Sequence, residues 1–413
     1  MPRPRTIAIG AFALLLAASP FVPHGGGDDG ALLPSGGQKP AAVLPADAVG
    51  YGDVTPALQR EIDRVVNQGL TLGRVSAKQT PERLAADLVR CADFAGQRYC
   101  LHTGWTTSDP AEVQARTAVA ARTLAARPAS TTTTGDLDVL GTMRRTAGLG
   151  TAARAEAERA ELTAAARSVA KVWLLRHEIE GVEIPAAFLD AHPEARATTS
   201  TARGTATTTA SAPTPLAART KTLGDYPQRA AILSPRRVAE QQTTYWCGPT
   251  SMQMIAWGWK KFDKGQTHWA EKLGTTTSGT AITDMVRVIN SSTGWDRPDY
   301  AGPYIPLDIG DYSFRQWKLL LMRHLVDYKA PVVLHPILLK RYYPYLDDDA
   351  SGHFQVGRGY DKRGSRPVAV GYFEPWNQQR FDPSEPYIER VQWRGAYKSY
   401  RANQDHFQHN IGV

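Results

Sequence analysis

The sequence predicts an α+β protein, in which a mostly α-helical N-terminal region precedes a C-terminal domain that combines helices with an antiparallel sheet. Residues 51–190 are rich in Ala and Arg and place apolar residues at helical spacing. Residues 191–222 are rich in Thr and Ala and form a predicted linker, because they offer little apolar surface to bury. Eight of the ten tryptophans follow this linker, so the best-packed core is expected in residues 223–413.

Residues 1–19 have the pattern of a signal peptide. A basic start is followed by an apolar run over residues 6–18, which is shorter than the ~18 residues that a membrane span needs. An uncleaved N-terminal anchor is the alternative. Residues 20–50 are rich in Gly, Pro and Ala and are predicted to be disordered. We therefore expect a secreted, extracellular protein with no membrane association after the signal peptide is removed.

Helix starts in the N-terminal region are marked by a capping residue followed by proline. This pattern occurs at Thr55, Thr80 and Asp109. A single long helix is expected from about residue 143 to residue 180, with Gly181 as its C-terminal cap. Three roles remain open for residues 51–190: an inhibitory pro-segment, a permanent targeting domain, or a helical spacer.

Composition excludes several classes of protein. The net charge of +8 is spread over 413 residues, which is too dilute for a nucleic-acid-binding protein. Three cysteines are too few for a disulfide-dense scaffold or a four-cysteine zinc site. No phosphate loop, nucleotide fingerprint or metal-ligand cluster is evident, so we expect no cofactor and no metal.

Because the chain has three cysteines, at least one thiol has no intramolecular disulfide partner. In an oxidising compartment Cys91 and Cys100 are expected to form a disulfide, although two free buried thiols are the alternative. Cys247 then has no partner, and it stands at the start of a predicted helix, since Pro249 is tolerated only in a first turn. The helix dipole and free backbone N–H groups at such a position favour the nucleophilic thiolate. A buried, inert cysteine is the alternative.

Polar residues around the predicted helix and a predicted hairpin complete a candidate site. Gln241 precedes Cys247 by six residues and is a candidate donor to an oxyanion, with a solvated loop glutamine as the alternative. Strands are predicted near residues 331–334, 351–361 and 367–376, and the last two form an antiparallel hairpin. His353 then starts one strand of the hairpin, opposite Glu374 at the end of the other, and a base oriented by a carboxylate is typical of nucleophilic catalysis. His335 is the main competitor as base.

These residues resemble the family-39 type of papain-like cysteine peptidases, relatives of the bacteriocin-leader (double-glycine) peptidases in a stand-alone secreted form. The motifs that carry the resemblance are Gln-x5-Cys-Gly-Pro at 241–249, Gly-His-x5-Gly-Tyr-Asp at 352–361 and Glu-Pro-Trp at 374–376. The resemblance covers residues 223–413 and implies a papain-like fold for them. It does not extend to the N-terminal region.

The resemblance also implies residue roles. Cys247 would be the nucleophile, His353 the general base, Gln241 the oxyanion donor and Glu374 the acid that orients the base. The family usually has Asp-Pro where this chain has Glu374-Pro375. Three other residues therefore remain alternatives for the orienting role: Asn377, Asp361 and Asp382.

The predicted function is a secreted thiol peptidase that hydrolyses peptide bonds through an acyl-enzyme. One alternative is a cell-wall amidase or another thiol acyl-transferase, and another is a binding module that keeps the peptidase fold with a weakened site. The expected partner is a peptide or protein substrate. The positive net charge is compatible with an acidic surface such as a cell-wall polymer.

Overall fold

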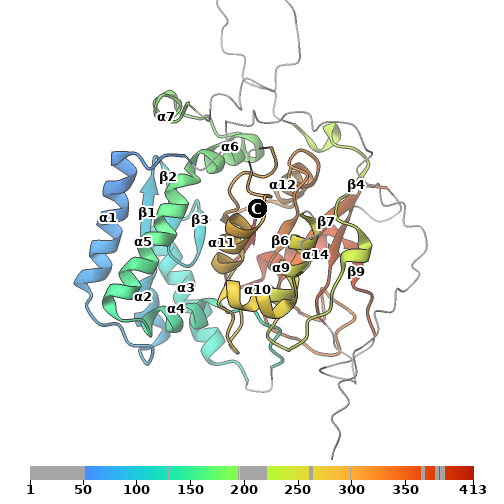
Figure 1. Ribbon diagram of the computed structural model, residues 1–413, viewed down its shortest axis with the longest axis horizontal. Coiled ribbons are helices and arrows are strands. Elements are labelled where there is room, and N and C mark those ends of the chain that lie inside the picture. The colour runs from blue at the N-terminus through green and yellow to red at the C-terminus, as the bar shows by residue number, and fades with distance from the viewer. Residues whose placement is uncertain are drawn as a thin grey trace, which may run out of the picture. The chain divides into compact units, whose positions relative to one another are not determined.

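The computed structural model describes residues 52–128, 131–193, 195, 221–259, 264–297, 299–363, 368–376, 381 and 387–413. The predicted signal peptide, the 20–50 segment and most of the predicted linker lie outside the described residues. Within the described ranges, twelve α-helices accompany a mixed sheet of ten strands, so the predicted α+β class is confirmed (Figure 1). None of the helices described is long and apolar enough to cross a membrane.

The N-terminal region has the predicted helix starts. The side chains of Thr55, Thr80 and Asp109 each accept a hydrogen bond from the first turn of the helix that follows, and each precedes a proline. Gly181 ends the last of the expected helices in the left-handed conformation, at φ 76°. The helices are α1 (Pro56–Thr71), α2 (Pro81–Leu88), α3 (Pro110–Ala125), α4 (Val139–Ala147), α5 (Thr151–Arg167), α6 (Val169–Glu180) and α7 (Ala186–Ala191).

The single helix expected over residues 143–180 is wrong, because α4, α5 and α6 replace it. The first break falls between Gly148 and Gly150, where Gly150 adopts an extended conformation before α5. Glycine loses more backbone entropy in a helix than any other residue, so a pair of them so close together is a natural place to end one. The second break is at Ser168, whose hydroxyl donates to the backbone oxygen of Ala165 and so competes with the helical pattern.

The N-terminal region also contains three short strands that the sequence did not predict: β1 (Cys91–Phe94), β2 (Gln97–Cys100) and β3 (Gly104–Thr106). Ala95 and Gly96 join β1 to β2 with positive φ angles of 52° and 81°, as in the two-residue hairpin turns that twist with the strands. Cys91 and Cys100 are directly opposite in this hairpin and form the predicted disulfide.

The sheet continues from the N-terminal region into the C-terminal domain. Strand β3 pairs in parallel with β5 (Pro306–Asp308), and the strand order is β1-β2-β3-β5-β10-β6-β7-β8-β9, with β4 paired to β7. The remaining strands are β4 (Arg229–Ala231), β6 (Val332–Leu334), β7 (Gln355–Asp361), β8 (Ala369–Phe373), β9 (Val391–Gly395) and β10 (Asn410–Gly412). The predicted antiparallel hairpin is confirmed as β7 and β8.

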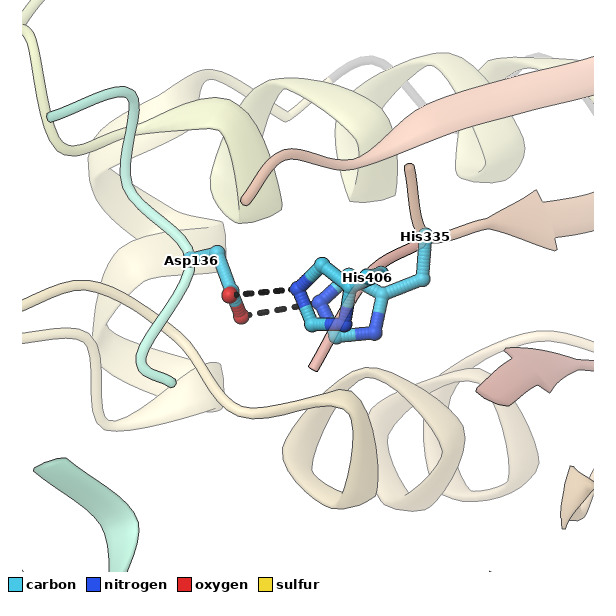
Figure 2. A group of neighbouring side chains, drawn as sticks. All are labelled: Asp136, His335 and His406. Atoms are coloured by element: carbon cyan, nitrogen blue, oxygen red, sulfur yellow. Dashed lines mark hydrogen bonds and ion pairs between the residues drawn. The ribbon is translucent and has the colours of Figure 1, made fainter. Parts of the chain in front are cut away.

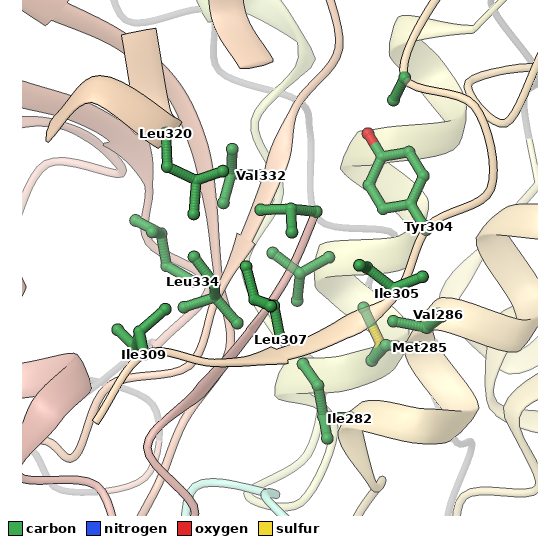
Figure 3. Close-up of a cluster of buried hydrophobic side chains, with 14 of the residues drawn as sticks. Ile282, Met285, Val286, Tyr304, Ile305, Leu307, Ile309, Leu320, Val332 and Leu334 are labelled. Atoms are coloured by element: carbon green, nitrogen blue, oxygen red, sulfur yellow. The ribbon is translucent and has the colours of Figure 1, made fainter. Parts of the chain in front are cut away.

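Helices of the C-terminal domain pack on this sheet around a buried apolar cluster. Figure 3 shows Ile282, Met285 and Val286 close to Leu307 and to side chains of β6. The helix that begins at the free cysteine packs against its neighbouring helices and β7, so the cluster fixes its position relative to the hairpin. The helices are α9 (Cys247–Gly258), α10 (Gln266–Leu273), α11 (Ile282–Ser292), α12 (Phe314–Val326) and α14 (Ala396–Gln404).

Candidate active site

Cys247 is the first residue of α9, as predicted, and its thiol is free and fully buried. Burial raises the pKa of Cys247 well above its ordinary value, and the negative charges of Asp136 and Glu374 raise it further. The backbone N–H groups of Gly248 and Phe354 reach the sulfur and lower the pKa, but they do not outweigh burial. The helix start therefore favours the thiolate, as expected, while burial opposes it. Burial offsets the helix dipole.

His353 and Glu374 meet at the end of the β7–β8 hairpin. His353 lies two residues before β7 and Glu374 directly follows β8. Imidazole Nε2 and carboxylate Oε1 are 2.7 Å apart, and both side chains are fully buried. The other ring nitrogen, Nδ1, makes no hydrogen bond within the described residues. The ring is thus held at Nε2 and has Nδ1 available, while the backbone of the next residue, Phe354, reaches the Cys247 sulfur.

The Glu374 carboxylate is saturated with donors. The N–H of Trp376 donates to Oε1 at 3.0 Å, and the Tyr345 hydroxyl and the Gln355 amide each donate to Oε2 at 2.7 Å. Burial alone raises the pKa of Glu374, but His353 and these hydrogen bonds outweigh it and lower the pKa below its ordinary value. A negative charge is therefore stable here, and the longer side chain of glutamate fits the position.

The other residues considered for the roles of Glu374 and His353 lie away from this pair or outside the described residues. Asp361 is at the opposite end of β7, where it forms ion pairs with Arg229 and Arg363. Asn377 and Asp382 lie outside the described residues. His335 follows β6 and its ring belongs to a different cluster, described below.

Gln241 is fully buried. It lies next to the residues that follow Glu374, because its backbone N–H donates to the oxygen of Pro375 at 2.8 Å. Its side-chain amide donates to the backbone oxygens of Thr243 and Thr244, in the turn that leads to Cys247. The same nitrogen also lies 3.3 Å from the backbone oxygen of Thr134, which belongs to the N-terminal region. The candidate oxyanion donor is thus in contact with a peptide carbonyl of the chain itself.

Sequence reasoning missed the part of the site formed by residues 132–137, hereafter the 132–137 segment. Its Thr134 N–H donates to the Ser351 hydroxyl at 3.0 Å, and the Ser351 N–H donates to Thr132 O at 3.0 Å. The Thr134 hydroxyl donates to Gly352 O at 2.6 Å. No sequence signal marks this segment, which lies within the region that was predicted to be mostly helical. Gly135, at φ 112°, lies so close to the Tyr245 backbone that a Cβ would overlap it.

Asp136, in the same segment, faces two imidazole rings of the C-terminal domain. Its carboxylate lies 2.9 Å from His335 Nε2 and 3.0 Å from His406 Nε2, and all three side chains are buried. Figure 2 shows the two rings pointing toward the carboxylate. Burial raises the pKa of Asp136, but the two histidines outweigh it and lower the pKa well below the ordinary value. Burial and the neighbouring His335 lower the pKa of His406 to about 4, so this ring is neutral near pH 7.

The three side chains have the composition and spacing of a metal site, but the hydrogen bonds argue otherwise. His406 Nδ1 accepts the backbone N–H of Gln408 at 3.1 Å. A neutral ring that accepts at Nδ1 carries its proton on Nε2 and cannot bind a metal there. His406 is therefore arranged to donate to the Asp136 carboxylate.

A buried Cys at a helix start and a His–carboxylate pair on the hairpin that this helix contacts are side chains that nucleophilic catalysis by a thiol requires. Residues 235–404 match the model of a family described as "Peptidase_C39 like family". This part of the chain is therefore C39-like and of the papain type, which confirms the resemblance. Comparisons with curated proteins and with solved structures gave no match.

Proposed function

We propose that this chain is a secreted peptidase in which Cys247 is the nucleophile, His353 the general base and Glu374 the acid that orients it. The observation that carries this proposal is the buried pair of His353 and Glu374, 2.7 Å apart, beside the helix-start cysteine of a C39-like domain. The disulfide Cys91–Cys100 supports an oxidising compartment. The substrate is a peptide or protein.

In the proposed chemistry, the general base is Nδ1 of His353. Nδ1 takes the proton of the Cys247 thiol, and the sulfur attacks the carbonyl carbon of the scissile bond. The Gln241 amide donates to the oxygen on which negative charge develops. The imidazolium, stabilised by Glu374, then returns its proton to the leaving amine, and a thioester remains on Cys247. Water, deprotonated by His353, hydrolyses the thioester and restores the thiol.

The environment of Glu374 bears on the binding-module alternative. A weakened site was conceivable because glutamate replaces the aspartate that is usual in the family. Four donors around the carboxylate, one of them His353, favour a working base over a remnant.

A peptide library with quantitative mass spectrometry tests this function. The full chain is incubated with the library beside Cys247→Ala and beside Asp361→Asn, a matched control at the far end of β7. We expect cleavage by wild type and Asp361→Asn and none by Cys247→Ala. Equal cleavage by Cys247→Ala would contradict the proposal. Release of peptides from cell wall but not from the library would favour the amidase alternative.

A further inference from the structure

The pocket around the Asp136 carboxylate is built from the C-terminal domain, but its occupant comes from the N-terminal region. His335 Nδ1 lies 2.8 Å from the side-chain oxygen of Asn410, whose amide nitrogen donates to Thr103 O. The oxygen of Asn410 is thus an acceptor and Nδ1 a donor. Nε2 of the same ring lies 2.9 Å from the Asp136 carboxylate. One ring nitrogen of each histidine thus faces one oxygen of the same carboxylate, and His406 is arranged to donate to it.

The pocket adjoins the proposed catalytic residues. The His335 ring stacks on Phe354, with centroids 4.5 Å apart, and Phe354 directly follows His353. Gly352 precedes His353, and a Cβ at this position would lie 2.2 Å from the Asp136 carboxylate. A residue without a side chain is thus needed beside the base for the carboxylate to enter. These contacts couple the occupant of the pocket to the geometry of the site.

The 132–137 segment crosses the site as a bound peptide would. Ser351 and Gly352, just before the base, bind its backbone and Thr134 side chain, while Gln241, before the nucleophile, contacts the Thr134 carbonyl oxygen. The Asp136 carboxylate enters the pocket two residues further along. Its charge disfavours the Cys247 thiolate. Transfer of the thiol proton to His353 is then less favourable, which opposes cleavage of the segment.

We propose that His335 and His406 form a carboxylate-binding subsite, which Asp136 fills in the resting chain. The substrate is then a peptide with an acidic side chain two residues C-terminal to the carbonyl that Gln241 contacts, a conclusion that rests on the peptidase function proposed above. Such a substrate replaces the 132–137 segment, so its binding and the exposure of Cys247 are the same event.

The occupancy of the subsite is tested by the reactivity of the thiol. Asp136→Asn keeps the side chain's size and removes its charge, and Asp138→Asn is the matched control, since asparagine also caps the helix start at this position. Cys247 is the free cysteine, so mass spectrometry of the full chain reports its alkylation by neutral iodoacetamide. We expect alkylation to be faster by about tenfold or more in Asp136→Asn, with no change in Asp138→Asn. Circular dichroism confirms that each variant is folded.

Two peptides test the specificity. One has the sequence of residues 131–138 and the other differs only by Asn in place of Asp at its sixth position. The Asp136→Asn variant should cleave the acidic peptide with a KM about tenfold lower than its KM for the Asn-containing peptide. Addition of His406→Gln to this variant should remove the difference between the two KM values. Equal KM values, or a stoichiometric metal ion that is lost with His406→Gln, would overturn the subsite.

The two proposals fail in different ways. If Cys247 becomes reactive in Asp136→Asn while no variant cleaves any peptide, the peptidase function is wrong and the occupied carboxylate pocket stands. If wild type cleaves library peptides while Asp136→Asn changes neither alkylation nor peptide preference, the subsite is wrong and the peptidase function stands.

Discussion

Replacement of Glu374 by glutamine removes a buried negative charge from His353 while preserving the length of the side chain. In the native site, His353 and the Trp376 N–H share carboxylate Oε1, and the Tyr345 hydroxyl and the Gln355 amide share Oε2. Glutamine has one carbonyl oxygen, so its amide nitrogen must face one of these two pairs of donors. The arrangement that leaves the oxygen with His353 breaks the two bonds at Oε2.

The expected effects follow from the hydrogen bonds that are lost at Oε2. Two hydrogen bonds to a charged group contribute about 1.5–3 kcal/mol each, and removal of the buried charge offsets part of their loss. We therefore expect a decrease of about 1–3 kcal/mol in the free energy of unfolding. The glutamine oxygen still orients the ring, so the loss of kcat/KM should lie near the lower end for a general base, about 10²-fold. This corresponds to about 3 kcal/mol of transition-state stabilisation.

The assay is the kcat/KM for a library-derived peptide, with urea unfolding measured on the same preparations. Asp361→Asn, whose carboxylate pairs with arginines away from the site, should stay within about threefold of wild type. A folded Glu374→Gln variant with kcat/KM within threefold of wild type would refute the role assigned to Glu374. An equal loss of activity in Glu374→Gln and Asp361→Asn would also refute this role, because the effect would then not be specific to Glu374.

Three further outcomes are expected. Replacement of Cys91 and Cys100 by serine should lower the free energy of unfolding by about 2–3 kcal/mol, measured by urea denaturation, because the disulfide closes a short loop. Gly352→Ala places a Cβ against the Asp136 carboxylate, so it should expel the 132–137 segment and speed alkylation of the Cys247 thiol; unchanged alkylation in a folded variant contradicts this. The pKa of Glu374 is lowered from 4.5, so its contribution to stability is complete above pH 4.5 and decreases as the pH falls through the folded-state value. The stability difference between wild type and Glu374→Gln should therefore shrink between pH 5 and pH 3.

Local signals account for most of the fold that the sequence predicts. A capping residue before proline defined three helix starts, and turn residues between two apolar runs defined the β7–β8 hairpin. The parallel pairing of β3 with β5 joins segments far apart in the chain, and these strands are only three residues long. So short a strand has no detectable period, and for this reason the shared sheet was missed. The boundaries of the predicted domains remain a prediction.

The candidate site was predictable to the extent that it lies within one continuous part of the chain. Cys247, His353 and Glu374 occur in motifs whose spacing implied a helix start and a hairpin. Asp136 was missed because His406, one of its partners, is 270 residues away in the sequence. Burial and the charge of Asp136, which raise the pKa of the Cys247 thiol, depend on such long-range contacts, whereas a helix start alone predicts a lowered pKa.

Detection of an acyl-enzyme on Cys247 tests its role as the nucleophile most directly. The Asp136→Asn variant is mixed with a cleavable peptide, quenched in acid within one turnover, digested and analysed by mass spectrometry. We expect the peptide containing Cys247 to gain the mass of the N-terminal product as a thioester, and His353→Ala to abolish this adduct. Cleavage of the substrate without any adduct on Cys247, and with equal rate in Cys247→Ala, would contradict a nucleophilic role for Cys247.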